Sequence, residues 1–164
     1  MKRIILLLAI CFMLASCAPK TEKDPFSAFD GALEVKIDAV IRELECSFSY
    51  SKADGVLTFS APSELEGIEI KEMDGSYTFS YDGVSVSVSE YAAAIVSACR
   101  KVFSAASEDM ISITAKELDG RILTLVTTET AEYAFSSDGT LLSVTGSIEG
   151  TPFVFCVTEM RADG

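Results

Sequence analysis

The residue types that most often carry catalysis are scarce in this chain of 164 residues. It contains no histidine, which rules out a Ser/His/Asp triad, a Cys/His pair and an imidazole ligand for a metal. A Ser-x-x-Lys spacing runs from Ser49 to Lys52, but positions three apart in a strand point to opposite faces of a sheet. We therefore interpret this spacing as a coincidence and expect no nucleophilic catalysis.

Carboxylates are plentiful, and four of them lie in one short segment: Glu64, Glu66, Glu69 and Glu72. Two carboxylates about 5–9 Å apart can hydrolyse a glycoside. None of the four stands among aromatic residues, as an active-site acid often does, so we interpret them as solvated groups at loop and strand edges. The sequence also lacks a calcium loop and a glycine-rich phosphate loop. It therefore predicts no enzyme, no metal site and no cofactor.

The most specific motif lies near the N-terminus. Lys2 and Arg3 precede an apolar run over residues 4–14, which is shorter than the stretch of about 20 residues that crosses a bilayer. This pattern is typical of a signal peptide. The run ends in the tetrapeptide LASC at residues 14–17, which resembles the bacterial lipobox. That motif predicts a diacylglyceryl group on the sulfur of Cys17 and cleavage just before it.

Export follows from either interpretation of this segment. If the lipobox is used, residues 1–16 are removed and Cys17 anchors the mature protein in a membrane through its acyl chains. The alternative is an ordinary secretory peptide that is cut near Ala15, with the cysteine incidental. We expect a lipoprotein of the bacterial cell envelope, on the outer face of the cytoplasmic membrane or in the outer membrane.

The charge of the chain limits its partners. The net charge is −12, and removal of the basic signal peptide makes the mature chain more acidic still. This excess argues against nucleic acid as a partner and against docking on anionic lipid through a basic patch. The length suits a single domain over residues 31–164, and the polar residues 17–30 are expected to form its tether.

Three cysteines remain once Cys11 has left with the signal peptide and Cys17 is modified: Cys46, Cys99 and Cys156. At most one disulfide can form among them. Cys46 and Cys156 lie in strand-like segments near the two ends of the domain, so either these two pair or all three remain buried reduced thiols. No two of them have the spacing of a CxxC redox or zinc motif.

Apolar and polar residues alternate along most of the mature chain, with the two-residue period of half-buried strands. Asp-Gly dipeptides begin at residues 54, 74, 82, 119 and 138, and this dipeptide favours tight turns between antiparallel strands. We predict a meander of about eleven strands, six before a helix and five after it. The apolar positions are Leu33, Val35, Ile37, Ala39, Leu44, Cys46, Phe48, Tyr50, Leu57, Phe59, Ile68, Ile70, Tyr77, Phe79, Tyr81, Val84, Val86, Val88, Ile111, Ile113, Ala115, Leu123, Leu125, Ala131, Tyr133, Phe135, Leu142, Val144, Phe153, Phe155 and Val157.

The period changes to that of a helix from Glu90 to about Ala106. Ser89 can cap its N-terminus, and Arg100 and Lys101 lie near its C-terminal end, where the helix dipole favours cations. Serine and threonine occupy the other face of several strands, so the sheet has one apolar and one wet face. Such a large sheet must curl and be covered. We therefore predict an α+β fold that is mostly antiparallel β, an incomplete barrel covered by one main helix.

Residues 54–88, DGVLTFSAPSELEGIEIKEMDGSYTFSYDGVSVSV, carry a resemblance to a known family. A strand that ends at Phe59, a loop that contains Pro62, and paired strands around Asp74-Gly75 are similar to a pattern in the outer-membrane lipoprotein carrier (LolA-like) superfamily. In topology the resemblance covers nearly the whole mature chain. It implies a non-catalytic activity, in which the hollow between sheet and helix holds acyl chains or serves to sense or present a partner.

Two interpretations of the interior stay open. In the first, the hollow is a lined cavity and the protein is a tethered module that binds lipid or another hydrophobic molecule. In the second, the same side chains pack together as a closed core, and a structural lipoprotein presents its wet face or rim to another envelope protein. The candidate lining residues are Phe48, Phe59, Tyr77, Phe79, Tyr81, Tyr91, Ile95, Val102 and Phe103.

Overall fold

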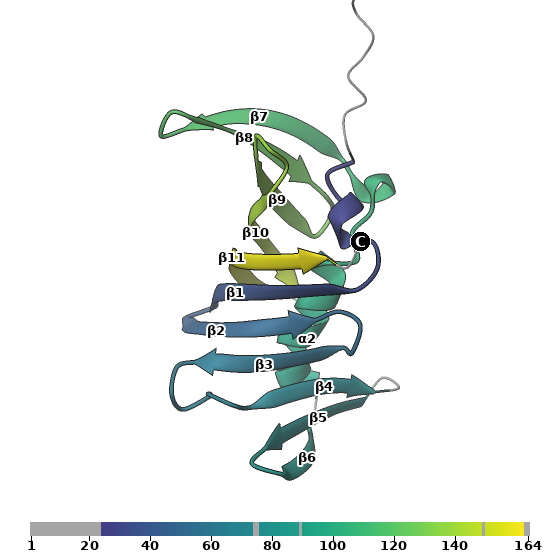
Figure 1. Ribbon diagram of the computed structural model, residues 1–164, viewed down its shortest axis with the longest axis vertical. Helices are drawn as coiled ribbons and strands as arrows, with labels where there is room; N and C mark the ends of the chain where they lie inside the picture. The colour runs from purple at the N-terminus through teal and green to yellow at the C-terminus, as the bar shows by residue number, and fades with distance from the viewer. Residues whose placement is uncertain (1–23, 74–75, 89, 149, 163–164) are drawn as a thin grey trace, which may run out of the picture.

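The computed structural model describes residues 24–162 except 74–75, 89 and 149. Eleven strands form one antiparallel sheet, and one α-helix lies against it (Figure 1). The predicted fold class, including the strand number, is thus confirmed. The elements are η1 (Ser27–Phe29), β1 (Leu33–Ile41), β2 (Leu44–Ser51), β3 (Val56–Ala61), β4 (Glu69–Met73), β5 (Ser76–Tyr81), β6 (Val84–Val88), α2 (Glu90–Val102), η2 (Ser107–Asp109), β7 (Ser112–Leu118), β8 (Arg121–Thr127), β9 (Ala131–Ser136), β10 (Leu141–Ile148) and β11 (Thr151–Ala162).

The sheet consists of two meanders joined along the first and last strands. Its order is β6-β5-β4-β3-β2-β1-β11-β10-β9-β8-β7. β1 pairs with β11 from Leu33 opposite Ala162 to Ile41 opposite Phe153. Because β6 and β7 are the two edges, the segment that contains α2 carries the chain from one edge of the sheet to the other (Figure 1). Within the described residues, no helix is long and apolar enough to cross a membrane.

Two of the Asp-Gly dipeptides form the tight turns that the sequence predicted. Asp82 and Gly83 have φ angles of 48° and 78°, and Asp119 and Gly120 have φ angles of 52° and 73°. Positive φ at both central residues is the requirement of the two-residue turn that matches the twist of a hairpin. These turns join β5 to β6 and β7 to β8. The dipeptide at residues 74–75 lies outside the described part of the chain.

Helix α2 packs on β4, β6 and β10 through one apolar face. It ends at Val102, four residues before the predicted end, and the predicted cap, Ser89, lies outside the described residues. Arg100 near its C-terminal end forms an ion pair with Glu72 of β4. The fully buried side chains on this face are Val96, Ala98, Cys99 and Val102, followed by Phe103 just after the helix.

The predicted tether is too long at its C-terminal end. Phe26 and Phe29 are both buried, and the ring of Phe26 lies 4.9 Å from that of Tyr133, centroid to centroid, in an edge-on arrangement. Residues 24–30 therefore pack on the domain instead of linking it to the membrane. The sequence did not indicate this packing, because the two phenylalanines stand among polar residues and show no helical or strand period.

One strand and one further position differ from the prediction. On β8 the buried residue is Val126, whereas Leu123 and Leu125 lie half-buried on the opposite face. On β10 the predicted Val144 is buried, but Leu141 is buried in place of Leu142, because the pairing with β9 shifts register between Leu141 and Ser143. Where both faces of a strand carry apolar residues, the two-residue period does not identify the inner face.

The cysteines of the domain lie too far apart on the sheet for the predicted pairing. Cys46 pairs with Ala39 and Cys156 pairs with Asp38, so they lie on opposite faces of the sheet with β1 between them. All three cysteines are free; Cys46 and Cys99 are buried and Cys156 is exposed. The Cys46–Cys156 disulfide is therefore wrong, and the alternative of three buried thiols holds for only two of them.

Candidate functional site

Four of the predicted lining residues are buried in the core between the sheet and α2. Phe48, Phe59, Val102 and Phe103 are at most 5% exposed. The ring of Phe48 lies 5.9 Å from that of Phe59 and 5.8 Å from that of Phe155. These distances are typical of packed aromatic pairs. Side chains therefore occupy the space around Phe48 that the first interpretation assigned to a cavity.

The other predicted lining residues are less buried. Tyr77, Phe79 and Ile95 are partly buried against the core. Tyr81 lies beside the β5–β6 turn and is 59% exposed, so the structure does not bring it into the buried set. The side chain of Tyr91 lies outside the described part of the chain.

A cavity of about 470 Å³ lies instead at the β7–β9 end of the sheet. Its wall is formed by the N-terminal turn at residues 24–28, residues 107–110, the inner faces of β7 and β8, and the end of β9 with the turn that follows it. Its lining residues are Asp24, Pro25, Ser27, Ala28, Ser107, Met110, Ile113, Thr124, Phe135, Ser136, Ser137, Asp138 and Gly139. Sequence reasoning missed this site, because its residues come from three distant segments and only the fold brings them together.

Strand register explains why this cavity is partly apolar. Ile113 of β7 is opposite Val126 of β8, and Thr124 of β8 is opposite Phe135 of β9. Opposite residues in an antiparallel pair share a face, and Val126 and Phe135 are buried core residues. The inner face of the core thus continues onto β7 and β8. There it is no longer covered, since all seven residues of β7 are exposed.

Two carboxylates on the wall of the cavity are held by hydrogen bonds. Asp138 accepts bonds from the hydroxyl of Ser136 and from the backbone N–H of Thr140, which together lower the pKa of Asp138. Asp24 accepts a bond of 2.9 Å from the backbone N–H of Phe26. Fixed negative charges at this position favour a ligand whose polar end is neutral or cationic over an anionic one.

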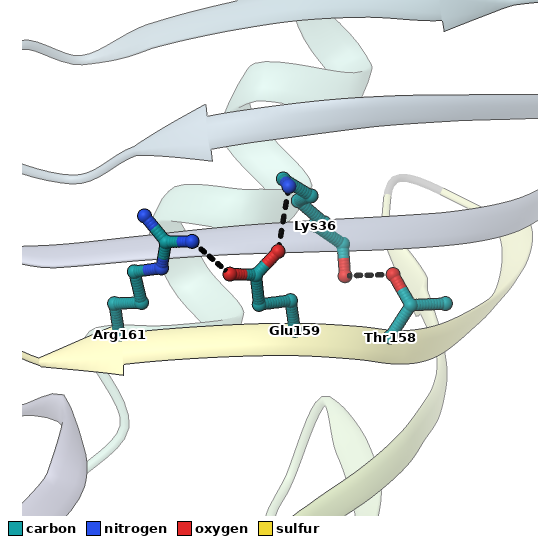
Figure 2. Close-up of polar contacts among 4 residues, drawn as sticks. All are labelled: Lys36, Thr158, Glu159 and Arg161. Atoms are coloured by element: carbon teal, nitrogen blue, oxygen red, sulfur yellow. Dashed lines mark hydrogen bonds and ion pairs between the residues drawn. The ribbon is translucent and has the colours of Figure 1, made fainter.

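The wet face of the sheet carries a second hollow, of about 460 Å³, whose charges pair with one another. Glu159 of β11 binds Lys36 of β1 at 2.6 Å and also pairs with Arg161 (Figure 2). Hydrogen bonds from these two cations lower the pKa of Glu159. In the same view, Thr158 donates a bond of 3.2 Å to the carbonyl of Lys36. Lys36, Glu159 and Arg161 therefore form a solvent-exposed ion-pair network that links β1 and β11.

The structure does not bring the glutamates of residues 64–72, or Ser49 and Lys52, together into one site. Glu69 lines the hollow on the wet face, whereas Glu72, three positions along β4, pairs with Arg100 of α2. Ser49 also lines the wet-face hollow, while Lys52 donates to the carbonyl of Phe29 at 2.6 Å. Within residues 24–162, apart from the gaps named above, no group of three or more acidic or cysteine side chains is placed to hold a metal ion.

No family model and no curated protein matches the sequence. The solved structures similar to this one include an uncharacterized conserved protein from Thermus thermophilus, with 10% identity, 84% of this chain and 82% of that chain covered, and a TM-score of 0.47. They also include the lipoprotein LppX from Mycobacterium tuberculosis, with 9% identity, coverage of 85% and 94%, and a TM-score of 0.44.

A third similar structure is a LolA superfamily protein from Nitrosomonas europaea, with 11% identity, coverage of 81% and 86%, and a TM-score of 0.34. The structural matches thus include a LolA superfamily protein and a mycobacterial lipoprotein, at low sequence identity.

Proposed function

We propose that this protein is a non-catalytic lipoprotein of the cell envelope that binds an apolar molecule, such as an acyl chain, in the cavity at the β7–β9 end. The observation that carries the proposal is the uncovered apolar surface at that cavity. Ile113 lines it and remains 46% exposed, although it lies opposite the fully buried Val126. Burial of the exposed part of this side chain by a ligand contributes on the order of 1 kcal/mol.

The size and chemistry of the cavity support an apolar ligand. Its volume of about 470 Å³ lies within the range of about 300–1,000 Å³ that is typical of ligand pockets. Ala28, Met110, Ile113 and Phe135 supply an apolar wall, and the carboxylates of Asp24 and Asp138 stand beside it. We therefore infer a ligand with an apolar chain and a polar end that is not anionic.

The envelope location rests on the sequence of the N-terminal segment. The tetrapeptide at residues 14–17 supports lipidation of Cys17, which lies outside the described residues. The first described residue, Asp24, lines the cavity.

A second candidate function is favoured by the filled core. Phe48, Phe59 and Phe103 are buried among other rings, which is what an interaction lipoprotein without a ligand requires. Such a protein would act through its surface on another envelope protein. The two candidates differ in whether the β7–β9 cavity takes up an apolar molecule.

Native mass spectrometry with organic extraction distinguishes them. The chain from residue 17, carrying Cys17→Ser, is purified from a bacterial host and analysed with and without offered lipids. We expect a bound lipid of defined mass that is lost in Ile113→Glu, because this change places a charge in the cavity. The matched control is Val86→Glu, an apolar position of comparable exposure on β6 at the opposite edge.

A clean apo mass with no uptake of offered lipids would overturn the first proposal and favour the interaction lipoprotein. Equal loss of the lipid in Ile113→Glu and Val86→Glu would also overturn it, because the ligand would then not reside in the β7–β9 cavity. Circular dichroism of both variants verifies that the fold is retained.

A further inference from the structure

The β7–β8 hairpin and the residue that precedes it carry large apolar side chains in water. Ile111, Ile113, Leu118 and Ile122 are between 46% and 64% exposed. Single exposed apolar residues are common, but several on one hairpin mark an interaction surface. Ile113 and Ile122 share the inner face of the hairpin, since Ile113 is opposite Val126 and Ile122 lies four positions from Val126 on the same strand.

The hairpin carries no net charge, although the chain as a whole is strongly acidic. Residues 112–127 contain two cations, Lys116 and Arg121, and two anions, Glu117 and Asp119, in a chain whose net charge is −12. A strongly acidic surface is repelled by an anionic lipid surface. The hairpin is a neutral, apolar part of the molecule and is therefore suited to contact with a bilayer.

The position of the N-terminal turn ties this hairpin to the membrane anchor. Asp24 and Ile113 line the same cavity, and Figure 1 shows the purple N-terminal turn beside the segment that leads into β7. Asp24 follows Cys17 by seven positions, and an extended chain of that length spans at most about 25 Å. An acyl group on Cys17 thus keeps the β7–β9 end within about 25 Å of the bilayer.

We propose that the inner face of the β7–β8 hairpin docks on the bilayer that holds Cys17, with Ile122 and Ile111 in the interfacial region. The docked hairpin turns the β7–β9 cavity toward the lipid. The inner face, which leads from Ile122 past Thr124 to Ile113, then connects the bilayer to the cavity. This inference rests on the proposed function, because it uses both the lipid on Cys17 and the apolar cavity.

Because the chain contains no tryptophan, a single introduced tryptophan reports whether its position contacts the bilayer. The acylated protein carrying Ile122→Trp is reconstituted in phosphatidylcholine vesicles whose acyl chains are brominated. We expect a blue-shifted emission and loss of most of it to bromine quenching. The matched control is Val84→Trp, because Val84 is 67% exposed at the opposite edge of the same sheet, and its emission is expected to stay unquenched.

Three outcomes overturn the docking proposal. The first is no quenching of the Ile122→Trp protein, and the second is equal quenching of both variants. The third is a blue shift without bromine quenching in a protein that sediments as a dimer, which would assign the hairpin to a second copy of the chain. The intact mass shows whether Cys17 carries the acyl group, and lipid extraction shows whether the cavity holds a ligand. Failure of docking is therefore distinguishable from failure of the proposed function.

Discussion

The hydroxyl of Tyr133 on β9 donates a hydrogen bond of 3.0 Å to the carbonyl of Val102, the last residue of α2. The last carbonyls of a helix lack partners within the helix. Both Tyr133 and Val102 are buried, so this carbonyl has no access to bulk water. The bond therefore fastens the end of the only α-helix in the described residues to the sheet, next to the β7–β9 end.

Tyr133→Phe is expected to destabilise the protein by about 0.5–1.5 kcal/mol, because it leaves the buried Val102 carbonyl with only the longer bond of 3.4 Å from the backbone N–H of Ala105. Urea unfolding followed by circular dichroism measures this change. The control is Tyr81→Phe, which removes an exposed hydroxyl and should change the stability by no more than about 0.5 kcal/mol. Equal effects of the two changes would show that the Tyr133 bond does not stabilise the fold.

Stability should fall at alkaline pH. Burial, followed by the nearby Cys99 and Glu72, raises the pKa of Tyr50 to about 12, and burial also raises the pKa of Tyr133. Because each pKa is raised in the folded state, the stabilisation from the protonated hydroxyl is complete below the pKa of an unfolded tyrosine, about 10. It is lost as the pH rises toward 12, by at most about 1.4 kcal/mol per pH unit and group. Urea midpoints between pH 8 and 11.5 measure the decline. Tyr50→Phe should make it shallower, and an unchanged slope would contradict the assignment.

Gly146→Ala should be strongly destabilising although glycine is not required there for its backbone angles. A Cβ at Gly146 on β10 would lie 2.6 Å from the carbonyl oxygen of Thr130 and 2.7 Å from the ring of Phe153. Overpacking of this kind costs typically about 1–3 kcal/mol. Thermal unfolding of Gly146→Ala against Ser143→Ala, on the same strand, checks the prediction. It fails if the two variants unfold at the same temperature.

A single thiol should react in the folded chain from residue 17 that carries Cys17→Ser. Cys156 is exposed, whereas Cys46 and Cys99 are buried, and burial raises the pKa of both buried thiols. Since the thiolate is the reactive form, iodoacetamide at neutral pH should add one group to the folded protein and three to the unfolded one, as read by intact mass. Cys156→Ser should abolish the fast reaction. Two fast adducts, or none in the parent chain, would contradict the placement of the thiols.

Phe26→Ala is expected to destabilise the domain by about 3–5 kcal/mol, as is usual for truncation of a buried aromatic residue. The ring of Phe26 contacts those of Phe29, Tyr133 and Phe135. Urea unfolding measures the loss, and Pro25→Ala beside it is the control. A loss of less than about 1 kcal/mol would mean that residues 24–30 act as the tether that the sequence predicted.

Local patterns in the sequence predicted much of the fold. The period of β1, with buried residues at Leu33, Val35 and Ile37, is visible in the sequence and appears unchanged in the structure. The same holds for the helix that begins at Glu90 and for the turns at Asp82-Gly83 and Asp119-Gly120. Each of these features depends on neighbours within a few residues, so the sequence by itself determined them.

Only the tertiary structure decided how the two meanders meet and where the cavity lies. The pairing of Leu33 with Ala162 joins residues from opposite ends of the chain, and no local period encodes such a contact. The cavity depends on the same long-range assembly, since Asp24, Ile113 and Phe135 come from three distant segments. The sequence left open whether Phe48 and its neighbours line a cavity or form a closed core. In the structure Phe48 belongs to a packed core. Apolar residues remain exposed on β7 and β8, because α2 packs on β4, β6 and β10 instead.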